Sequence, residues 1–347
     1  MEPEKYCLER SFMTLGLGLT RKCNLSCPMC YYRQKLFSSP YNSADKFIID
    51  NINKNLDEVC GEVSSCELEL SKLVTILSEI KKVGTILLGL EGEPLCHSEF
   101  LKIVEICSHY SDKQIVVTNG LLLSRNHIEQ FNRYNVTTVI LSCDADNKET
   151  YEQLRRGGNF IKFCRNAKLT ARLFNGETMI HTVIHSGNTE VVEKMPVLAH
   201  NLGITRISLA QLRENSWSEK HGLRRADEVH LVDCLTKMIR NAEYYGIKII
   251  FDNFFAFGEQ LINIKNIFSD YSNILLKPFS RCPYPWLFSS ILSDGRIFPC
   301  CGDIKPFAID SYNFESVFNS PEHRYLKKVW SGDEELPEVC INCMIGK

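Results

Sequence analysis

Short apolar runs alternate with amphipathic stretches along most of the chain, from residue 15 to about residue 252. The runs expected to form strands are 15–19, 85–90, 114–118, 137–142, 179–184, 204–209 and 247–251. The stretches with helical periodicity include 68–82, 99–109, 125–133 and 226–245. Because strand and helix alternate, the pattern predicts βαβ units built around a parallel sheet.

The number of these units predicts the architecture of an α/β protein. Six or so repeats favour a partial (β/α)6 TIM-like barrel over a doubly wound sheet. Residues 31–65 interrupt the alternation, since a strand-to-helix connection is normally about 2–6 residues long. This polar, Asn-rich insertion is expected near the active-site mouth, either as a lid or as a surface excursion.

The composition of the chain changes after residue 252. Residues 253–279 are rich in Phe, Ile and Asn and are expected to form a helical linker, and 280–347 are dense in Cys, Pro and Gly. We therefore predict a core domain at 1–252, a linker at 253–279 and a small C-terminal domain at 280–347.

Composition and charge limit the kinds of partner and the cellular compartment that we expect for this protein. The formal net charge of −2 comes from balanced signs, so no nucleic-acid partner is expected. No apolar run reaches the roughly 18–20 residues of a membrane span. The first ten residues lack a signal-peptide core, which predicts a cytoplasmic protein. In that compartment the 16 cysteines are expected to be thiols or metal ligands rather than disulfides.

Three cysteines directly follow the first expected strand. Cys23, Cys27 and Cys30 have the spacing C-x3-C-x2-C. Three thiolates so close in sequence can wrap a loop around one iron–sulfur cluster, and supplying three instead of four leaves one iron open. Two alternatives are a zinc site, which needs a fourth ligand, and three core cysteines on one helical face. Arg21 and Lys22 place positive charge beside the thiolates.

This motif resembles the radical S-adenosylmethionine (SAM) superfamily. The resemblance implies that Cys23, Cys27 and Cys30 hold a [4Fe–4S] cluster whose open iron chelates SAM. Reductive cleavage of SAM then gives a 5′-deoxyadenosyl radical, which abstracts hydrogen from the substrate. The family usually has an aromatic residue before the third cysteine, near the adenine, and this chain has Met29 there.

Further motifs resemble family elements at later strand ends. Glu91-Gly92-Glu93-Pro94 is similar to the Gly-Gly-Glu-Pro motif that receives the SAM amino group, with Glu91 in place of the first glycine. Gly92, Glu93 and Pro94 are therefore candidate SAM contacts. The strand ends at Asn119 and Ser142 add two more, although Asn119-Gly120 is also a turn signal. Arg155 is expected to reach the SAM carboxylate or the substrate, the alternative being an exposed helix charge.

A second group of cysteines lies near the C-terminus. Cys282, Cys300, Cys340 and Cys343 supply four thiolates, with Cys301 as the alternative to Cys300. Asp294-Gly295 suits a hairpin that returns Cys300 toward Cys282. The pattern resembles the SPASM or shorter twitch domain, which implies an auxiliary [4Fe–4S] cluster. A zinc ribbon is the alternative.

Two clusters suggest a division of labour, in which the second accepts an electron from a substrate radical. The architecture resembles the 2-deoxy-scyllo-inosamine dehydrogenases, so we expect radical oxidation of a polar small molecule such as a sugar or aminocyclitol. The alternatives are a peptide-modifying (RiPP) maturase and a radical epimerase, in which Cys143, Cys164 or Cys234 would donate hydrogen. A zinc-stabilised binding module is the non-enzyme alternative. The enzyme would draw electrons from a flavodoxin- or ferredoxin-type donor, and no residue is assigned as its catalytic base.

Overall fold

The computed structural model describes residues 14–30, 67–80, 82–212, 214, 216–251, 288–293, 295, 297, 298 and 328. The insertion expected at 31–65, the linker expected at 253–279 and all five candidate auxiliary cysteines lie outside these residues. The candidate SAM site lies inside them.

The described strands form one sheet that does not close. They are β1 (Thr14–Leu17), β2 (Thr85–Leu88), β3 (Gln114–Thr118), β4 (Val136–Ser142), β5 (Glu177–Ile184), β6 (Arg206–Gln211), β7 (Lys248–Phe251), β8 (Phe288–Ile291) and β9 (Ile297–Phe298). Their order is β7-β6-β5-β4-β3-β2-β1-β8-β9. Strands β1 to β8 pair in parallel, and β9 is antiparallel to β8. The predicted strands and the partial barrel are confirmed.

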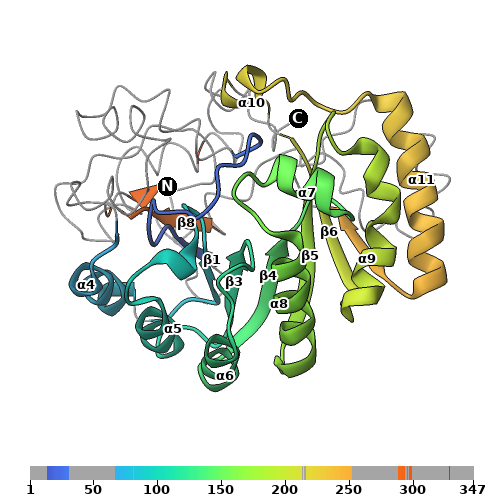
Figure 1. Cartoon of the computed structure of the whole chain (residues 1–347). Helices are drawn as coiled ribbons and strands as arrows, with labels where there is room; N and C mark the ends of the chain where they lie inside the picture. Colours follow the sequence, from blue (N-terminus) through green and yellow to red (C-terminus); the bar gives the residue numbers. More distant parts are fainter. Residues whose placement is uncertain are drawn as a thin grey trace.

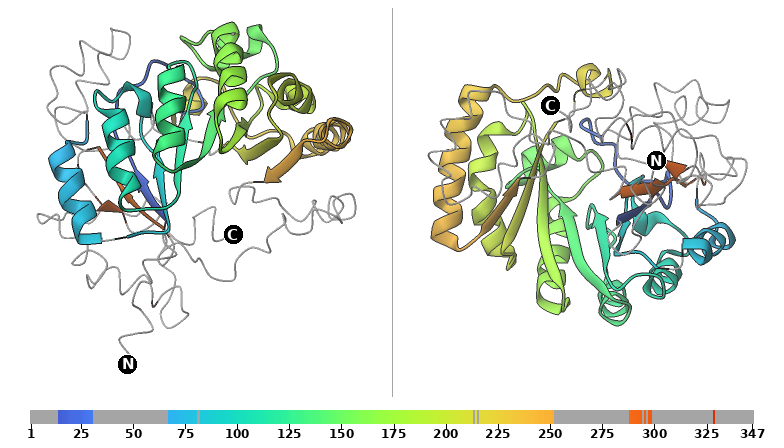
Figure 2. Two further views of the ribbon diagram at one scale, coloured as in Figure 1. Left: turned by 90° about the horizontal axis from the view of Figure 1, so that it is seen from below. Right: turned by 180° about the vertical axis from the view of Figure 1, so that it is seen from behind.

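Helices line the outside of this curved sheet (Figures 1 and 2). The helices of the described residues are α4 (Leu70–Ile80), η3 (Pro94–Cys96), α5 (Phe100–Ser108), α6 (Arg125–Arg133), α7 (Lys148–Leu154), α8 (Phe160–Leu173), η4 (Thr189–Lys194), α9 (Met195–Leu202), α10 (Ser216–Lys220) and α11 (Glu228–Tyr245). Among the described residues, no helix is both long and apolar enough to pass through a lipid bilayer.

Alternation along the strands gives the sheet two different faces. In β4, Val139 and Leu141 are fully buried in the core that the helices share, whereas the alternate residues Ile140 and Ser142 are half-buried. Successive side chains of a strand point to opposite faces, so the half-buried set lines the inner face of the barrel. The carboxyl ends of the parallel strands meet at one edge, where the loop after β1, helix α7 and helix α10 gather (Figure 1).

Strand β8 was not predicted, and it comes from the predicted C-terminal domain. It pairs in parallel with β1 from Thr14↔Phe288 to Leu17↔Ile291. The N–H of Gly18 donates to the carbonyl of Ile291 at 2.7 Å and continues this ladder by one bond. The antiparallel pairing of β8 with β9 confirms the hairpin expected near Asp294-Gly295. The C-terminal segment is therefore joined to the barrel by backbone hydrogen bonds.

A buried amide on α8 fixes the turn that follows β3. Asn166 Nδ2 donates to the carbonyls of Gly120 (2.9 Å) and Leu121 (3.2 Å). The Asn166 side chain is buried, so water cannot take its place as the hydrogen-bond donor to these two carbonyls. The turn carries Asn119, and Asn166 therefore positions a candidate cofactor contact from behind.

We expect Asn166→Ala to lower the free energy of unfolding by about 1–3 kcal/mol, because two buried carbonyls lose their donor. Anaerobic urea denaturation measures the change. Ile161→Ala on the same helix is the control, since Ile161 is 69% exposed and should change stability by less than about 0.5 kcal/mol. Equal stability of the two variants would contradict the role given to Asn166.

Candidate functional site

The three cysteines lie on an irregular loop after β1. Cys23, Cys27 and Cys30 are half-buried thiols outside any disulfide, and the N–H of Cys30 donates to the carbonyl of Cys27 at 3.2 Å. The loop contains no helix, so the three thiols do not form one helical face. No cysteine in the described ranges takes part in a disulfide. Within the same ranges, no group of three Cys, His, Asp or Glu side chains is arranged to bind a single metal ion. An iron–sulfur cluster requires a different arrangement of its ligands, because each cysteine binds a different iron.

Hydrogen bonds to four later parts of the chain hold this loop. They are Glu93 N to Lys22 O (2.8 Å), Ser26 N to Arg156 O (2.9 Å), Asn119 Nδ2 to Asn24 Oδ1 (2.8 Å) and Trp217 Nε1 to Cys27 O (3.1 Å). The donors and acceptors outside the loop follow β2, β3, β4 and β6. The loop is therefore positioned by the carboxyl ends of successive strands, where barrel enzymes place their active sites.

The electrostatic surroundings of the loop suit iron. Burial raises the pKa of the Cys23 thiol well above its ordinary value, and the nearby Glu93 carboxylate and Cys27 thiol raise it further. Cysteine binds iron as the thiolate, so the loop needs the positive charge of a metal to hold its sulfurs ionised. Lys22 supplies little of it directly, because its Nζ pairs with Glu67 Oε1 at 3.3 Å. The donor set fits an iron–sulfur cluster.

The turn after β2 lies directly against the cysteine loop. Gly92 has a φ of +52°, and a Cβ there would lie 2.4 Å from the carbonyl oxygens of both Thr20 and Lys22. Only glycine combines this left-handed conformation with so close an approach of two backbones. Pro94 begins η3, whose first N–H groups are capped by Glu93 through Leu95 N at 3.4 Å.

Glu93 is the central acceptor of this turn. Its carboxylate is buried and accepts hydrogen bonds from Thr118 Oγ1 at 2.5 Å and from Asn119 N at 2.8 Å. Burial raises the pKa of Glu93 to about 7, although these hydrogen bonds and the charge of Arg155 act in the opposite direction. The group therefore changes charge near neutral pH.

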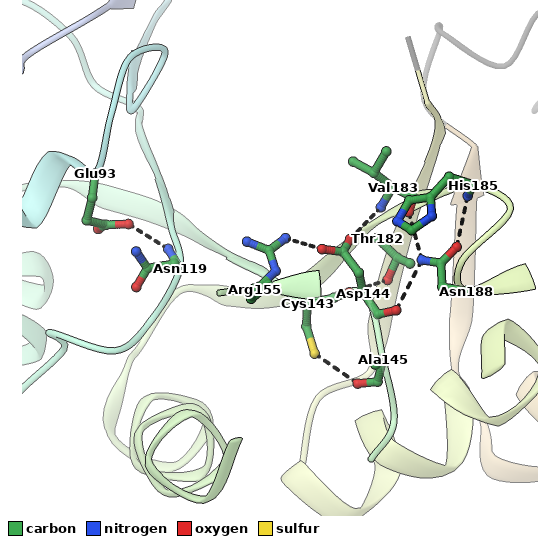
Figure 3. A network of polar contacts seen from close by, with 10 residues as sticks. All are labelled: Glu93, Asn119, Cys143, Asp144, Ala145, Arg155, Thr182, Val183, His185 and Asn188. Carbon is green, nitrogen blue, oxygen red and sulfur yellow. Dashed lines mark hydrogen bonds and ion pairs between the residues drawn. The ribbon is translucent and has the colours of Figure 1, made fainter. Parts of the chain in front are cut away.

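Arg155 turns inward at the end of α7. Its Nη2 lies 2.6 Å from Asp144 Oδ2, with 9% of the Arg155 side chain exposed and none of Asp144. Figure 3 shows it between Asp144 and the pair Glu93–Asn119. The sequence-based alternative of an exposed helix charge is wrong, because residue 155 caps the helix and leaves its surface. Its buried Nε–H has no hydrogen-bond partner among the described residues. A buried donor of this kind is suited to binding a ligand.

The three candidate hydrogen-donor cysteines lie on elements other than the cysteine loop. Cys143 is fully buried in the core beneath the helices, and its thiol donates to the carbonyl of Ala145 at 3.2 Å. Burial raises the pKa of Cys143 strongly. Cys234 lies on α11, 3.8 Å from His230 on the same helix, and Cys164 lies half-buried on α8. The structure does not bring these three thiols together with Cys23, Cys27 and Cys30.

The other expected SAM contacts lie around the loop. Met29 is buried in a small apolar cluster with Leu154, Leu212 and Leu223, against which Cys27 and Val183 pack. Ser142 ends β4 and is half-buried opposite His181 of β5. Asn119 follows β3 and donates to the loop, as described above. Every candidate SAM residue thus lies at the carboxyl edge of the sheet.

Sequence reasoning missed two side chains near these candidate contacts. His181 lies two residues before Val183 on the same strand face, and its Nδ1 is 3.2 Å from Ser208 Oγ. The alternation of Ile180 and Ile184 into the helix-covered core was a signal that His181 points inward. Trp217 had no such signal, because α10 is only five residues long and its contact with Cys27 is purely tertiary.

Comparison with known proteins identifies the class. The model of the radical SAM superfamily matches residues 17–195, and that of the SPASM iron–sulfur cluster-binding domain matches residues 282–344. The chain belongs to the radical SAM superfamily. It is a radical SAM enzyme with a C-terminal SPASM domain, and these two domains indicate [4Fe–4S] clusters and SAM as its cofactors.

Two relatives match along almost the whole chain. The antilisterial bacteriocin subtilosin biosynthesis protein AlbA of Bacillus subtilis is 25% identical over 95% of this chain and 63% of its own length. The PqqA peptide cyclase of Gluconobacter oxydans is 22% identical over 95% of this chain and 82% of its own. The chain thus spans less than two thirds of AlbA.

Solved structures share the fold. Streptococcus suis SuiB bound to S-adenosylmethionine aligns with a TM-score of 0.61 at 16% identity, over 99% of this chain and 73% of SuiB. The same protein bound to its precursor peptide SuiA aligns with a TM-score of 0.63 at 15% identity, over 99% and 72%. At such identities the likeness shows the barrel architecture.

We expect Gly92→Ala to displace the cysteine loop. The added Cβ meets two backbone oxygens, so the variant should lose more stability than the roughly 1–2 kcal/mol of left-handed strain and should reconstitute without the first cluster. Gly246→Ala is the matched control, because Gly246 also has a positive φ (+66°) but no atom within 4 Å of a Cβ. Iron content and thermal denaturation measure both effects. Full iron loading of Gly92→Ala would contradict the packing described here.

Proposed function

We propose that this radical SAM enzyme modifies a peptide. The observation that carries the proposal is the match of 95% of the chain to AlbA, a bacteriocin biosynthesis protein, and to the PqqA peptide cyclase. SuiB, whose fold is similar, has been solved with a precursor peptide. These comparisons favour the peptide-modifying alternative over the oxidation of a sugar or aminocyclitol that the sequence favoured.

In this proposal the loop after β1 is the catalytic cluster site. Cys23, Cys27 and Cys30 each hold one iron of a [4Fe–4S] cluster and leave the fourth iron open to SAM. A cluster held there would supply the electron for reductive cleavage of SAM, the chemistry that would let the enzyme remove a hydrogen atom from the peptide. Two observations support this assignment. The three thiols are half-buried on one loop, and burial together with nearby acidic groups raises the pKa of Cys23.

The surrounding side chains would bind and orient SAM. Glu93 and the backbone of Gly92 and Pro94 receive the amino group, and the buried, unpartnered Nε–H of Arg155 is a donor for the carboxylate. Met29 offers its soft apolar side chain to the adenine. Asn119 and Ser142 add polar contacts from the ends of β3 and β4.

The SPASM domain would complete the reaction. Cys282, Cys300 (or Cys301), Cys340 and Cys343 are the proposed ligands of the auxiliary cluster, which accepts an electron from the substrate radical. A flavodoxin- or ferredoxin-type protein is the proposed electron donor. His181 is the one titratable side chain that the described strands place on the inner face near mid-height, so it is our candidate to accept the substrate proton.

Transfer of label tests the substrate class. The reconstituted enzyme, with SAM and dithionite, is given short peptides encoded by neighbouring genes in which candidate residues are deuterated, and in parallel deuterated sugars and aminocyclitols. We expect deuterium in 5′-deoxyadenosine, together with a mass change of the peptide, only with a peptide. Transfer from an aminocyclitol without a change in any peptide would overturn the proposal.

We expect Cys23→Ala, Cys27→Ala or Cys30→Ala to abolish SAM cleavage while the auxiliary cluster stays bound. Iron should fall from about eight to about four per chain, since only one [4Fe–4S] cluster remains. Iron analysis and 5′-deoxyadenosine formation measure the two effects. Cys107→Ala is the control, because Cys107 is buried on α5 in the apolar core. Undiminished SAM cleavage in any of the three variants would sink the ligand assignment.

The affinity for SAM should depend on pH through Glu93. A pKa of about 7 in the free protein means that the carboxyl group is mostly protonated at about pH 6 and must lose that proton to accept a hydrogen bond from SAM. The contribution of Glu93 should therefore weaken SAM binding roughly eightfold between about pH 7.5 and pH 6. Anaerobic equilibrium dialysis measures it.

Glu93→Gln is the control for this experiment, because glutamine cannot ionise. The amino group of SAM titrates in both proteins, so the difference between their pH profiles is the contribution of Glu93. Parallel profiles for wild type and Glu93→Gln would show that Glu93 does not titrate with SAM.

A further inference from the structure

Glu91, the residue that departs from the family motif, makes a contact between distant parts of the chain. Its side chain is 3% exposed, and its Oε2 accepts a hydrogen bond from the backbone N–H of Ser293 at 2.7 Å. Ser293 lies 202 residues further along, immediately beyond β8 in the region that matches the SPASM domain. A glycine at position 91 has no side chain with which to make this bond.

The neighbouring chain is shaped to accept this carboxylate. A Cβ at Gly18 would lie 2.7 Å from both Cγ and Oε2 of Glu91, so the glutamate occupies the space that a side chain at position 18 would fill. Gly18 also donates its N–H to Ile291, two residues before Ser293. The ends of β1, β2 and β8 therefore meet around one buried carboxylate.

The residues on either side of this contact lead to both cofactor regions. Toward the barrel, Gly92 and Glu93 contact the backbone of the cysteine loop, as described above. Toward the C-terminus, β8 turns into β9 with Ile291 opposite Ile297, and Cys300 follows two residues after β9. A single turn thus touches the loop of one cluster and the hairpin that leads to a candidate ligand of the other.

We propose that Glu91 is a positioning residue that couples the SAM-binding turn to the SPASM hairpin. A ligand that orders the turn at Gly92 and Glu93 thereby restrains β8 and β9 through the Glu91–Ser293 bond. The chemistry of the link is a buried carboxylate that accepts a backbone N–H, a charge-assisted bond of the stronger kind. The inference rests on the proposed placement of SAM at Glu93, but not on the identity of the substrate.

Hydrogen–deuterium exchange of the full-length reconstituted protein tests the coupling. We expect Glu91→Gly to raise exchange in peptides covering 288–298 at least tenfold. The Ser293 amide loses its hydrogen-bond acceptor, and the space that the Glu91 side chain occupies beside Gly18 is left empty. Glu91→Gln is the matched control, since its amide oxygen still accepts from Ser293, and exchange should stay close to wild type. Addition of SAM should slow exchange at 288–298 in the wild type and in Glu91→Gln, and leave Glu91→Gly unchanged.

The outcomes separate the possibilities. If Glu91→Gly exchanges like Glu91→Gln, the contact does not restrain the hairpin and the proposal is wrong. If exchange rises in Glu91→Gly but SAM still slows it, Glu91 is only a structural contact and the coupling is wrong. Should Glu91→Gly not fold, Ser293→Pro removes the donor N–H and Ser293→Ala keeps it, and the same two comparisons apply to that pair. No peptide is present, so failure of the proposed peptide modification leaves this result unaffected.

Discussion

The close approach of two backbones at Gly92 is the constraint on which the site depends. A carbonyl from each of Thr20 and Lys22 lies where a side chain at position 92 would stand. This contact brings the loop after β1 against the turn after β2 and allows Glu93 N to bond Lys22. Once the loop is fixed there, its other bonds to Arg156, Asn119 and Trp217 follow from parallel strands that end at the same edge. The geometry of three cysteines thus depends on a residue that has no side chain.

The unclosed sheet explains how a strand from the SPASM region joins the barrel. A closed barrel would have no free edge beside β1. Here β8 occupies that edge, so a segment from the far end of the chain lies within one strand of the cysteine loop. The end of β8 is consequently a neighbour of the cysteine loop through the sheet itself, and the buried carboxylate of Glu91 adds a side-chain bond to the same junction.

Much of the fold was predictable because its signals are local. The strands from β1 to β7 are apolar runs in a parallel sheet that helices cover, and α6 begins and ends where its periodicity predicts. Strand β8 was missed because Phe288–Ile291 is short and partly polar, and only its partner β1 makes it a strand. Arg155 was placed near the site, but its local sequence suggested a surface charge equally well. Its inward course depends on Asp144, which is adjacent only in the folded chain. Trp217 lies at the site for the same tertiary reason.

The balance of charge at the carboxyl edge shows what the site requires. Asp144 and Glu93 are buried there beside the thiols of Cys23 and Cys27, and Arg155 is the buried cation that faces them in the described structure. Burial disfavours the ionised forms of Glu93 and Cys23 and raises the pKa of both. A protein of this class gains the missing positive charge from iron and from the sulfonium of SAM. The burial that raises the pKa values of Glu93 and Cys23 therefore makes their ionised forms depend on positive charge brought by the cofactors, and this dependence links the charge of the site to its loading.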